Sequence, residues 1–309
     1  MQKSATSAAI PLRPESGITA LGEHAPRAKA GLAVMILAFN EEINLPQCLA
    51  SLGGLKCEVV VVDSGSADRT VEIAREFGAA VQFHPFENYA IQRNWALSNL
   101  PYDVPWVLQL DADERLTPEL VNEINALMER SEISADGFLL RKRTIFMGRW
   151  IRHGGHYPAY HLRLFRHGKG RCEDRLYDQH FLVDGPVERL RHDYMDIVAS
   201  NLSSWSARHV RWAAMEASEM ATTGSKHGQV DPQMLGNPIQ RRRWWRNTYG
   251  QAPLFLRAFF YWVYRYFFRL GFLDGTEGLI FHFLQGFWFR FLVDSVMFEQ
   301  RQLSARTTK

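Results

Sequence analysis

Short apolar runs alternate with polar, helix-forming segments between residues 32 and 120. The predicted strands are residues 32–37, 58–62, 80–84 and 106–110. Each run is rich in β-branched or other apolar side chains, as in strands that are buried on both faces of a sheet. The predicted helices between them are residues 43–52, 68–77 and 91–100. This alternation predicts βαβ units built around a parallel sheet.

The pattern changes beyond residue 116. Thr117 is predicted to cap a helix that begins at Pro118, because Thr accepts hydrogen bonds from a first turn and Pro is tolerated there. Further strands are predicted over residues 137–141 and 160–166, separated by a stretch rich in Gly, His and Tyr. A long helix is predicted over about residues 201–222.

Polar and acidic side chains directly follow three of the predicted strands. Asn40 and Glu41 come after the first, Asp63 ends the second, and Asp111 and Asp113 stand just past the fourth. Ligands of such sheets bind outside the carboxyl ends of the strands, so these side chains are predicted to meet at one edge. Mg²⁺ and Mn²⁺ commonly take one or two carboxylates together with substrate phosphates. The sequence thus predicts a divalent-cation site at the two aspartates, with a solvated acidic turn as the alternative.

Composition and charge narrow the class of protein. The 309 residues are 46% hydrophobic, which is enough for one large α/β domain with an appendage. A net charge of +3 is too small to indicate a nucleic-acid partner, and none is predicted. The three cysteines lie far apart, which argues against a structural zinc site or a disulfide framework and fits a reducing compartment. Residues 1–30 lack the apolar segment of a secretory signal and are predicted to form a disordered tail.

The chain becomes basic and strongly aromatic from Arg241 onward. Within and just after residues 254–268, polar positions recur every four residues at Arg257, Tyr261, Arg265 and Arg269. A second segment repeats this spacing at His282, Gly286, Arg290 and Asp294. Helical periodicity places each set on one stripe, so we expect helices that lie in a membrane interface with the polar stripe in water and the aromatic face in lipid. The alternative is that these helices cover the preceding domain or pair in a dimer.

Four segments of the first half resemble a known family in the order in which they occur. They are residues 36–42 (ILAFNEE), 61–70 (VVDSGSADRT), 92–96 (QRNWA) and 110–114 (LDADE). Together they resemble the donor-binding and metal motifs of inverting family 2 glycosyltransferases. Residues 146–155 (FMGRWIRHGG), 162–166 (LRLFR) and 270–275 (LGFLDG) resemble a bacterial branch that makes lipopolysaccharide core and exopolysaccharide.

The resemblance implies an α/β fold of the GT-A type, Rossmann-like with a mostly parallel central sheet, followed by C-terminal amphipathic aromatic helices. Residues 31–235 would form the catalytic domain, with the nucleotide-sugar half ending near residue 120. Residues 236–309 would form the membrane-associating region. The residues expected to bind the donor are Ala38, Phe39, Asn40, Glu41, Asp63, Ser64, Arg93, Asp111 and Ala112.

Individual roles also follow from the resemblance. Arg93 would lie near the donor phosphates, and Asp113 together with Asp111 would bind Mn²⁺ or Mg²⁺. Many relatives have a second Asp where this chain has Ser64, which leaves the contact with the nucleotide base open.

The acceptor hydroxyl needs a carboxylate that takes its proton on the face opposite the diphosphate. Similar enzymes often carry a His-Glu pair where this chain has Tyr177 and Asp178, so Asp178 is the favoured base. Asp174 is its rival, because an adjacent Glu-Asp pair serves in other relatives. The carboxylate that is not the base would form a surface salt bridge with Arg171 or Arg175.

The resulting hypothesis is an inverting glycosyltransferase with a nucleotide diphosphate sugar donor, UDP-hexose by resemblance. Its acceptor would be a membrane glycolipid of lipopolysaccharide core or exopolysaccharide synthesis. The enzyme would be peripheral at the cytoplasmic face of the bacterial inner membrane. Two rival hypotheses are transfer to polyprenyl phosphate itself and a non-catalytic nucleotide-binding membrane scaffold.

Overall fold

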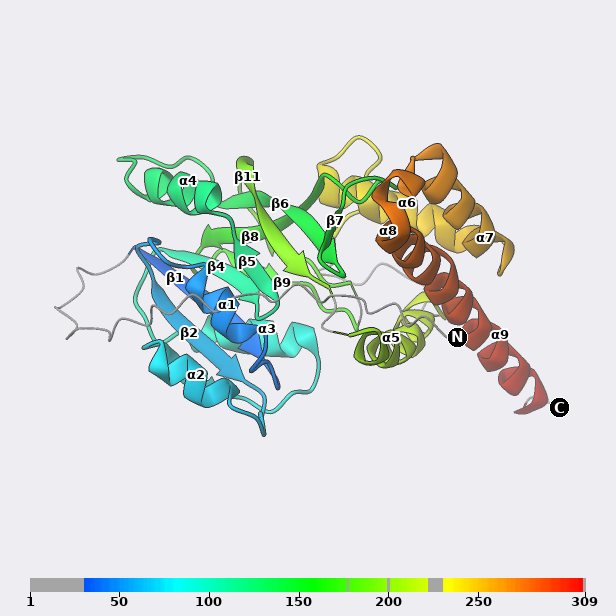
Figure 1. Cartoon of the computed structure of the whole chain (residues 1–309), viewed down its shortest axis with the longest axis horizontal. Helices are drawn as coiled ribbons and strands as arrows, with labels where there is room; N and C mark the ends of the chain where they lie inside the picture. The colour runs from blue at the N-terminus through cyan, green and yellow to red at the C-terminus, as the bar shows by residue number, and fades with distance from the viewer. Residues whose placement is uncertain (1–30, 177, 199–200, 222–229, 308–309) are drawn as a thin grey trace, which may run out of the picture.

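The fold is described from a computed structural model. It covers residues 31–176, 178–198, 201–221 and 230–307. The predicted tail over residues 1–30 and Tyr177 lie outside the described residues. In Figure 1 the N-terminal half and its sheet lie to the left, and helices α6–α9 lie to the right.

The first four strands form the parallel part of the sheet, as the sequence predicts. They are β1 (Leu32–Ala38), β2 (Glu58–Asp63), β3 (Ala80–Phe83) and β4 (Trp106–Asp111). Their order in the sheet is β3-β2-β1-β4, and every neighbouring pair is parallel. The side chains of β1, β2 and β4 are almost all buried, because helices cover both faces.

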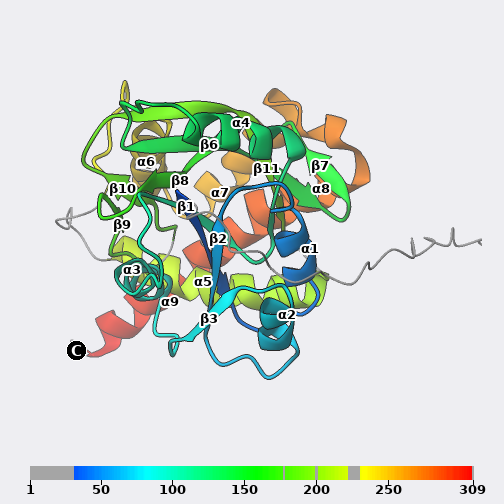
Figure 2. The same ribbon diagram turned by 90° about the vertical axis from the view of Figure 1, so that its left-hand side faces the viewer.

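Helices α1 (Leu45–Ala50) and α2 (Thr70–Glu76) lie on one side of these strands, and α3 (Tyr89–Ser98) lies on the other, as Figure 2 shows. Two apolar cores result, one on each face of the sheet. Helix α4 (Pro118–Met128) follows β4 and begins as predicted. The Thr117 side chain accepts a hydrogen bond from the backbone N–H of Leu120, and proline occupies the first turn.

The second half of the sheet is mixed. Its strands are β5 (Glu114–Leu116), β6 (Gly137–Phe146), β7 (Arg149–Ile151), β8 (Ala159–Arg166) and β11 (Val187–Ile197). Strand β8 joins β4 and β6 by antiparallel pairing, and β6 pairs with β11 in parallel. A small antiparallel pair, β9 (Gly170–Cys172) and β10 (Phe181–Val183), holds the ends of the segment that contains Asp174 and Asp178.

The C-terminal third is helical. Its elements are α5 (Leu202–Ala221), α6 (Pro238–Gln251), α7 (Leu256–Val263), the π-helical turn η1 (Tyr264–Phe268), the 3₁₀ turn η2 (Gly271–Asp274), α8 (Gly275–Phe281), the π-helical turn η3 (His282–Trp288) and α9 (Phe289–Thr307). Asn237 and Gln240 form a capping box at the start of α6. Helices α5 and α9 share an apolar core that includes Ala213, Ala217 and Phe289.

Most residues of the polar stripes in the C-terminal segments point inward, which corrects the expectation that these stripes lie in water; Arg269, at the end of the first stripe, is exposed. Arg257 and Asp294 are 4% and 1% exposed, and they form an ion pair between α7 and α9. Arg290 lies 2.7 Å from Glu216 of α5. Arg265 and His282 are buried as well. Helical spacing identifies which residues share a stripe, but the partners on other helices decide which way the stripe faces.

Aromatic side chains occupy the outside of the same helices. The exposed phenylalanine rings, which we call the aromatic surface, are those of Phe259, Phe260, Phe267, Phe268, Phe272, Phe283, Phe291 and Phe298. No helix in the described parts of the chain is both long enough and apolar enough to cross a bilayer.

Candidate active site

The carboxyl ends of β1, β2 and β4 bring the predicted donor residues to one edge of the sheet. Ala38 pairs with Asp63 on β2, and Leu37 pairs with Asp111 on β4. The acidic clusters that follow these strands are therefore neighbours in space, although up to 73 positions separate them in sequence.

The loop after β1 is held by the loop after β2. Asn40 has a positive φ of 54°, and its backbone N–H donates to the Ser66 hydroxyl at 2.8 Å. The backbone N–H of Glu41 donates to Thr70 Oγ1 at the same distance. Phe39 is 57% exposed beside these groups, so its ring is accessible to a planar ligand. These hydrogen bonds fix the position of the loop after β1 at one side of the site.

Asp63 organises the second loop from within. Its Oδ2 accepts hydrogen bonds from the backbone N–H groups of Gly65 and Ser66, and its Oδ1 accepts from the Ser66 hydroxyl. Ser64 Oγ accepts a hydrogen bond from Gln92 of α3 at 3.1 Å. Part of the Asp63 carboxylate is therefore engaged by its own chain, and Ser64 is tied to α3.

Asp111 is clamped by cations. Arg93 Nη2 lies 3.2 Å from Asp111 Oδ1, and Arg163 Nη2 lies 3.1 Å from Oδ2. Gln109 donates to Oδ1 as well, at 2.9 Å. Burial alone would raise the pKa of Asp111, but the two guanidinium groups and these hydrogen bonds hold it well below its usual range.

Asp113 is in the opposite situation. Within the described parts of the chain, its carboxylate has no hydrogen bond or ion pair, and Asp196 of β11 is the charge that acts on it most strongly. Burial is the largest cause that raises the pKa of Asp113 well above its usual value, and the nearby carboxylates Asp196, Asp111, Glu114 and Glu41 add to it. Such a group favours either a proton or a bound cation.

The donor set therefore fits a hard divalent cation at Asp113. Among the described residues, no three His, Cys, Asp or Glu side chains lie close enough together to hold a metal ion by themselves. A cation bound beside Asp113 would take its other ligands from phosphate oxygens and water, which is the usual arrangement for Mg²⁺ in nucleotide sites. Both oxygens of Asp111 are already hydrogen-bonded to Arg93 and Arg163, so Asp113 is the better of the two predicted ligands.

The two candidate bases differ in their surroundings. Asp178 lies under α6, where Arg246 reaches its Oδ2 at 2.5 Å and Arg242 reaches its Oδ1 at 3.5 Å. Burial alone would raise the pKa of Asp178, but these arginines hold it well below its usual value, so the carboxylate is ionised at neutral pH. Asp174 is exposed. Of the two arginines predicted to pair with the carboxylate that is not the base, Arg171 lies 2.6 Å from Asp184 and Arg175 lies 3.7 Å from Glu219.

Glu173, next to Asp174, is a fully buried anchor of the same segment. It accepts hydrogen bonds from the backbone and ring of His180 and from Arg243 of α6 at 2.7 Å. It also accepts from the backbone N–H of Val230. Helix α6 thereby fixes the segment that carries both candidate bases.

A chain of polar contacts links the two sides of the site. Arg163, which holds Asp111, lies over the ring of Tyr194. The Tyr194 hydroxyl meets His161 Nδ1 at 2.8 Å, and His161 Nε2 lies 3.5 Å from Arg242. The metal motif and Asp178 are thus joined through side chains of β8, β11 and α6.

Three residues that the fold brings to the site were not among the predicted site residues: Arg163, Asp196 and Arg208. Arg163 belongs to the segment LRLFR. In a strand it shares a face with His161 and Phe165, and a charged residue on that face could have indicated a role in the site. Asp196 lies outside all the motifs found in the sequence, so no local signal pointed to it. Arg208 of α5 lies close enough to act on Glu41 and Tyr89, opposing the rise that burial produces in the pKa of each.

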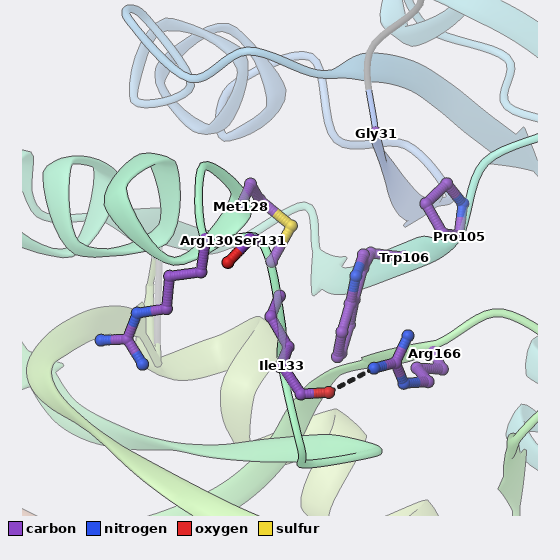
Figure 3. Close-up of a pocket in the computed structure, with 8 residues that line it drawn as sticks. All are labelled: Gly31, Pro105, Trp106, Met128, Arg130, Ser131, Ile133 and Arg166. Atoms are coloured by element: carbon purple, nitrogen blue, oxygen red, sulfur yellow. Dashed lines mark hydrogen bonds between the residues drawn. The ribbon is translucent and has the colours of Figure 1, made fainter.

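A separate pocket lies at the far end of the sheet, where β1 and β4 begin (Figure 3). Trp106 and Arg166 are among its lining residues, and the Arg166 guanidinium lies over the indole ring. Its lining contains no carboxylate. Because it lies at the amino ends of these strands, this pocket is not part of the acidic site.

Comparison with known proteins agrees with this geometry. Residues 33–181 match the sequence model of the family described as Glycosyl transferase family 2. The chain carries a glycosyltransferase family 2 domain. This domain is that of glycosyltransferases, and the fold is of the GT-A type. The matched segment includes the donor loops, Asp111, Asp113, Asp174 and Asp178.

Among individual relatives, the lipopolysaccharide core biosynthesis glycosyltransferase LpsC of Rhizobium meliloti is 27% identical over 266 residues, which cover 83% of this chain and 90% of LpsC. An uncharacterized glycosyltransferase of Rickettsia typhi is 40% identical over 93 residues, which span 30% of this chain and only 31% of that protein.

Solved structures resemble this glycosyltransferase more distantly. Residues 1–349 of S. aureus TarS in complex with UDP show 15% identity and a TM-score of 0.45, covering 88% of this chain and 91% of that one. The mannosyltransferase PcManGT from Pyrobaculum calidifontis, in complex with GDP-Man and Mn²⁺, shows 15% identity and a TM-score of 0.46, with 88% of each chain covered.

Proposed function

We propose that this glycosyltransferase transfers a hexose from a nucleotide diphosphate donor, UDP-hexose, to a membrane glycolipid of lipopolysaccharide core or exopolysaccharide synthesis. The anomeric configuration would be inverted. The observation that carries the donor half of the proposal is the contrast between Asp111 and Asp113. Asp111 is clamped by two arginines, whereas the Asp113 carboxylate lies among other carboxylates and has no partner in the described parts of the chain. The similarity to LpsC supports the choice of acceptor.

The donor residues act by binding and charge compensation. The loops at Asn40 and Asp63 would hold the nucleoside, with the Phe39 ring beside the base. Arg93, Arg163 and Arg208 supply positive charge around the acidic cluster, where the diphosphate leaves. A divalent cation held by Asp113 would neutralise the charge that grows on the leaving phosphate oxygens.

A single displacement accounts for inversion. The acceptor hydroxyl oxygen forms a bond to the anomeric carbon while the bond from that carbon to the diphosphate oxygen breaks, through an oxocarbenium-like state. We assign the proton of the attacking hydroxyl to Asp178, because its carboxylate is ionised and the contacts through His161 and Arg242 connect it to the metal motif. Asp174 stays the rival, since it is the adjacent carboxylate on the same segment.

Donor hydrolysis tests the donor half of the proposal. Purified protein is incubated with UDP-glucose, other UDP-sugars and GDP- or dTDP-sugars, each with Mn²⁺, with Mg²⁺ and with EDTA. We expect release of the nucleoside diphosphate from a UDP-hexose with either metal and at least a tenfold lower rate after chelation, because the leaving charge is then uncompensated. Rates that are equal with EDTA and with Mn²⁺ would refute metal dependence.

A membrane glycolipid acceptor requires the enzyme to bind the membrane, and the aromatic surface is suited to that binding. Five of its rings contact the half-buried rings of Phe255, Trp262 and Phe287, at centroid separations of 5.1 to 6.3 Å; they are those of Phe259, Phe267, Phe283, Phe291 and Phe298. Rings of this kind favour the boundary between headgroups and acyl chains. We propose peripheral attachment to the cytoplasmic face of the inner membrane through this surface, with the buried polar stripe holding the helices together.

Removing three rings from the aromatic surface tests this attachment. Phe260, Phe267 and Phe268 are 63%, 51% and 75% exposed, so their replacement by Ser should leave the fold intact. We expect the triple variant to bind vesicles of phosphatidylethanolamine and phosphatidylglycerol at least tenfold more weakly in a sedimentation assay, because apolar area no longer enters the interface. Leu235→Ser is the matched control, since Leu235 is 96% exposed but lies outside the surface. Equal vesicle binding by wild type and triple variant would contradict the attachment.

The two rival functions predict different products. Transfer to polyprenyl phosphate would give a sugar phosphate diester that mild acid cleaves, whereas a glycoside on a glycolipid resists it. A non-catalytic scaffold would bind the nucleotide sugar without releasing the nucleoside diphosphate.

A further inference from the structure

A buried guanidinium that lacks a counter-anion among the described residues lies where the loop at Gly154 meets η1. Arg265 is 8% exposed; its Nε donates to the Gly154 carbonyl and its Nη1 to the Tyr261 hydroxyl, both at 2.6 Å. Its Nη2 is buried and has no hydrogen-bond partner among the residues that the structure describes. No carboxylate of the described residues forms an ion pair with Arg265, unlike Arg257 two turns earlier, which is paired with Asp294. A buried charge of this kind is costly unless an anion meets it.

The carboxylates of this region are committed to other cations. Glu216 receives Arg246 at 2.9 Å and Arg290 at 2.7 Å. Asp274 accepts hydrogen bonds from the backbone and ring of His153, and Asp294 is paired with Arg257. The anion that Arg265 lacks is therefore not supplied by these neighbours.

The backbone around Arg265 is closely fitted. Gly154 has a φ of +65°, and a Cβ at this position would come within 2.1 Å of the His282 ring. The Gly154 N–H also donates to the carbonyl of Arg269, so the loop and the end of η1 hold each other. Arg265 thus has a fixed place, and its free donor is presented in one direction.

Further cations and donors gather at the same place. His156 follows Gly154 by two residues, and its buried Nε2 finds no hydrogen-bond partner within the described parts of the chain. Arg265, Lys142 and Arg242 all lie close enough to His156 to add to the lowering of its pKa, for which burial is the largest cause. Lys142 in turn contacts Asp196 at 2.6 Å, beside Asp113. The group formed by Arg265, His156, Lys142 and Arg242 therefore lies between the metal motif and the helices that carry the aromatic surface.

We propose that Arg265, His156, Lys142 and Arg242 bind a phosphate group, the one carried by the membrane glycolipid acceptor. A phosphate oxygen can accept from the free Nη2 of Arg265 and from the imidazole N–H of His156, while the other two cations balance its charge. Residues that flank Arg265 in η1, Phe267 and Phe268, belong to the aromatic surface, so a phosphate near the bilayer surface is within reach. The inference rests on the proposed function, because it names a chemical feature of the acceptor.

Phosphate-dependent stabilisation of the full-length protein tests the site. We expect inorganic phosphate to raise the Tm of the wild type by about 3 °C relative to sodium chloride of equal ionic strength, at a phosphate concentration about tenfold above Kd. Arg265→Met should lose at least two thirds of this shift. Without phosphate its Tm should be unchanged or higher, because a buried unpaired charge has been replaced by an apolar side chain. Arg269→Met is the matched control; Arg269 is an exposed arginine of the same segment, and this variant should keep the full shift.

The site would be overturned if phosphate raised the Tm of the wild type and of Arg265→Met equally, or if it did not raise the Tm of the wild type. Equal Tm shifts would place the phosphate elsewhere, for instance at the donor arginines. Should Arg265→Met not fold, Arg265→Lys replaces it, since Lys keeps the charge but cannot make both hydrogen bonds of the guanidinium; its shift should fall by at least half, and a full shift would overturn the site.

Vesicles and acceptor competition identify the source of the phosphate. If a bilayer headgroup occupies the site, Arg265→Met loses the preference for phosphatidylglycerol over phosphatidylcholine vesicles. If the acceptor phosphate occupies it, that preference is kept, and inorganic phosphate inhibits sugar transfer competitively with the acceptor. Either result supports the shared chemistry. Wild-type donor hydrolysis is measured alongside, so hydrolysis without a phosphate shift overturns this site alone.

Discussion

Replacing Asp113 by Ala is expected to lower metal-dependent donor turnover by about a thousandfold, the largest effect of any single substitution in the donor site. The carboxylate of Asp113 has no partner among the described residues, and it lies among the charges of Asp196, Glu114 and Glu41. A divalent cation bound beside Asp113 would offset the negative charge of both the leaving diphosphate and the surrounding carboxylates. Without Asp113 the cation loses its ligand from the metal motif, and several kcal/mol of charge stabilisation are lost with it.

The measurement combines kinetics with metal binding. Release of the nucleoside diphosphate is followed over a Mn²⁺ titration, and Mn²⁺ binding in the presence of UDP is measured by isothermal titration. Asp113→Ala should weaken both, while its Tm in metal-free buffer should stay the same or rise, because a repelled carboxylate has been removed. Retained turnover at low Mn²⁺ would show that Asp113 is not the ligand.

Asp111 provides the matched comparison within the same motif. Its carboxylate holds Arg93 and Arg163. Among the described residues, Asp111→Ala would leave the buried guanidinium of Arg93 without an ion pair, and Arg163 would keep only Glu114. We expect this variant to lose stability as well as turnover, whereas Asp113→Ala loses turnover alone. Opposite behaviour of the two variants would reverse the roles assigned to them.

Replacing Asp178 by Asn is expected to lower sugar transfer to the acceptor by about 10²- to 10⁴-fold, the range that a positioned general base contributes. The amide has the same size but cannot take the proton of the attacking hydroxyl. Transfer is measured as radiolabelled sugar in the lipid extract of bacterial membranes that contain lipopolysaccharide. Asp174→Asn is the control, and we expect it to retain most of the activity.

The pH profile separates a base from a merely structural carboxylate. Arg242 and Arg246 keep the pKa of Asp178 well below its usual value, so the carboxylate stays ionised as pH falls toward 5. Wild-type transfer should therefore show no acid limb from this group. In Asp178→Asn the rate should rise with pH, because the acceptor hydroxyl must lose its proton to solvent. A full rate in Asp178→Asn together with a loss in Asp174→Asn would make Asp174 the base.

Much of the donor site could be predicted from local sequence. A run such as residues 58–62 is apolar at every position, which only a strand covered on both faces tolerates, so the parallel arrangement of β1, β2 and β4 followed. Parallel strands end at one edge, and this places Asn40, Asp63 and Asp111 together without any knowledge of side-chain contacts. The four ordered motifs then indicated the family, which the match over residues 33–181 confirms.

Contacts between distant residues were decided only by the tertiary structure. Nothing local to Asp111 and Asp113 distinguishes them, yet Arg93 and Arg163, from α3 and β8, reach only the first. The direction of the C-terminal polar stripes was predicted wrongly for the same reason. Periodicity shows that Arg257 and Arg265 share a stripe. It does not show whether the arginine face or the aromatic face of the helix packs against the rest of the protein. The buried carboxylates Asp294 and Glu216 pair with arginines of the stripes, so the arginine face is the one that packs inward. Sequence alone thus determined the four parallel strands, their common edge and the chemistry of the residues there. The partners of each charge depended on which elements the folded chain brings within a few ångströms.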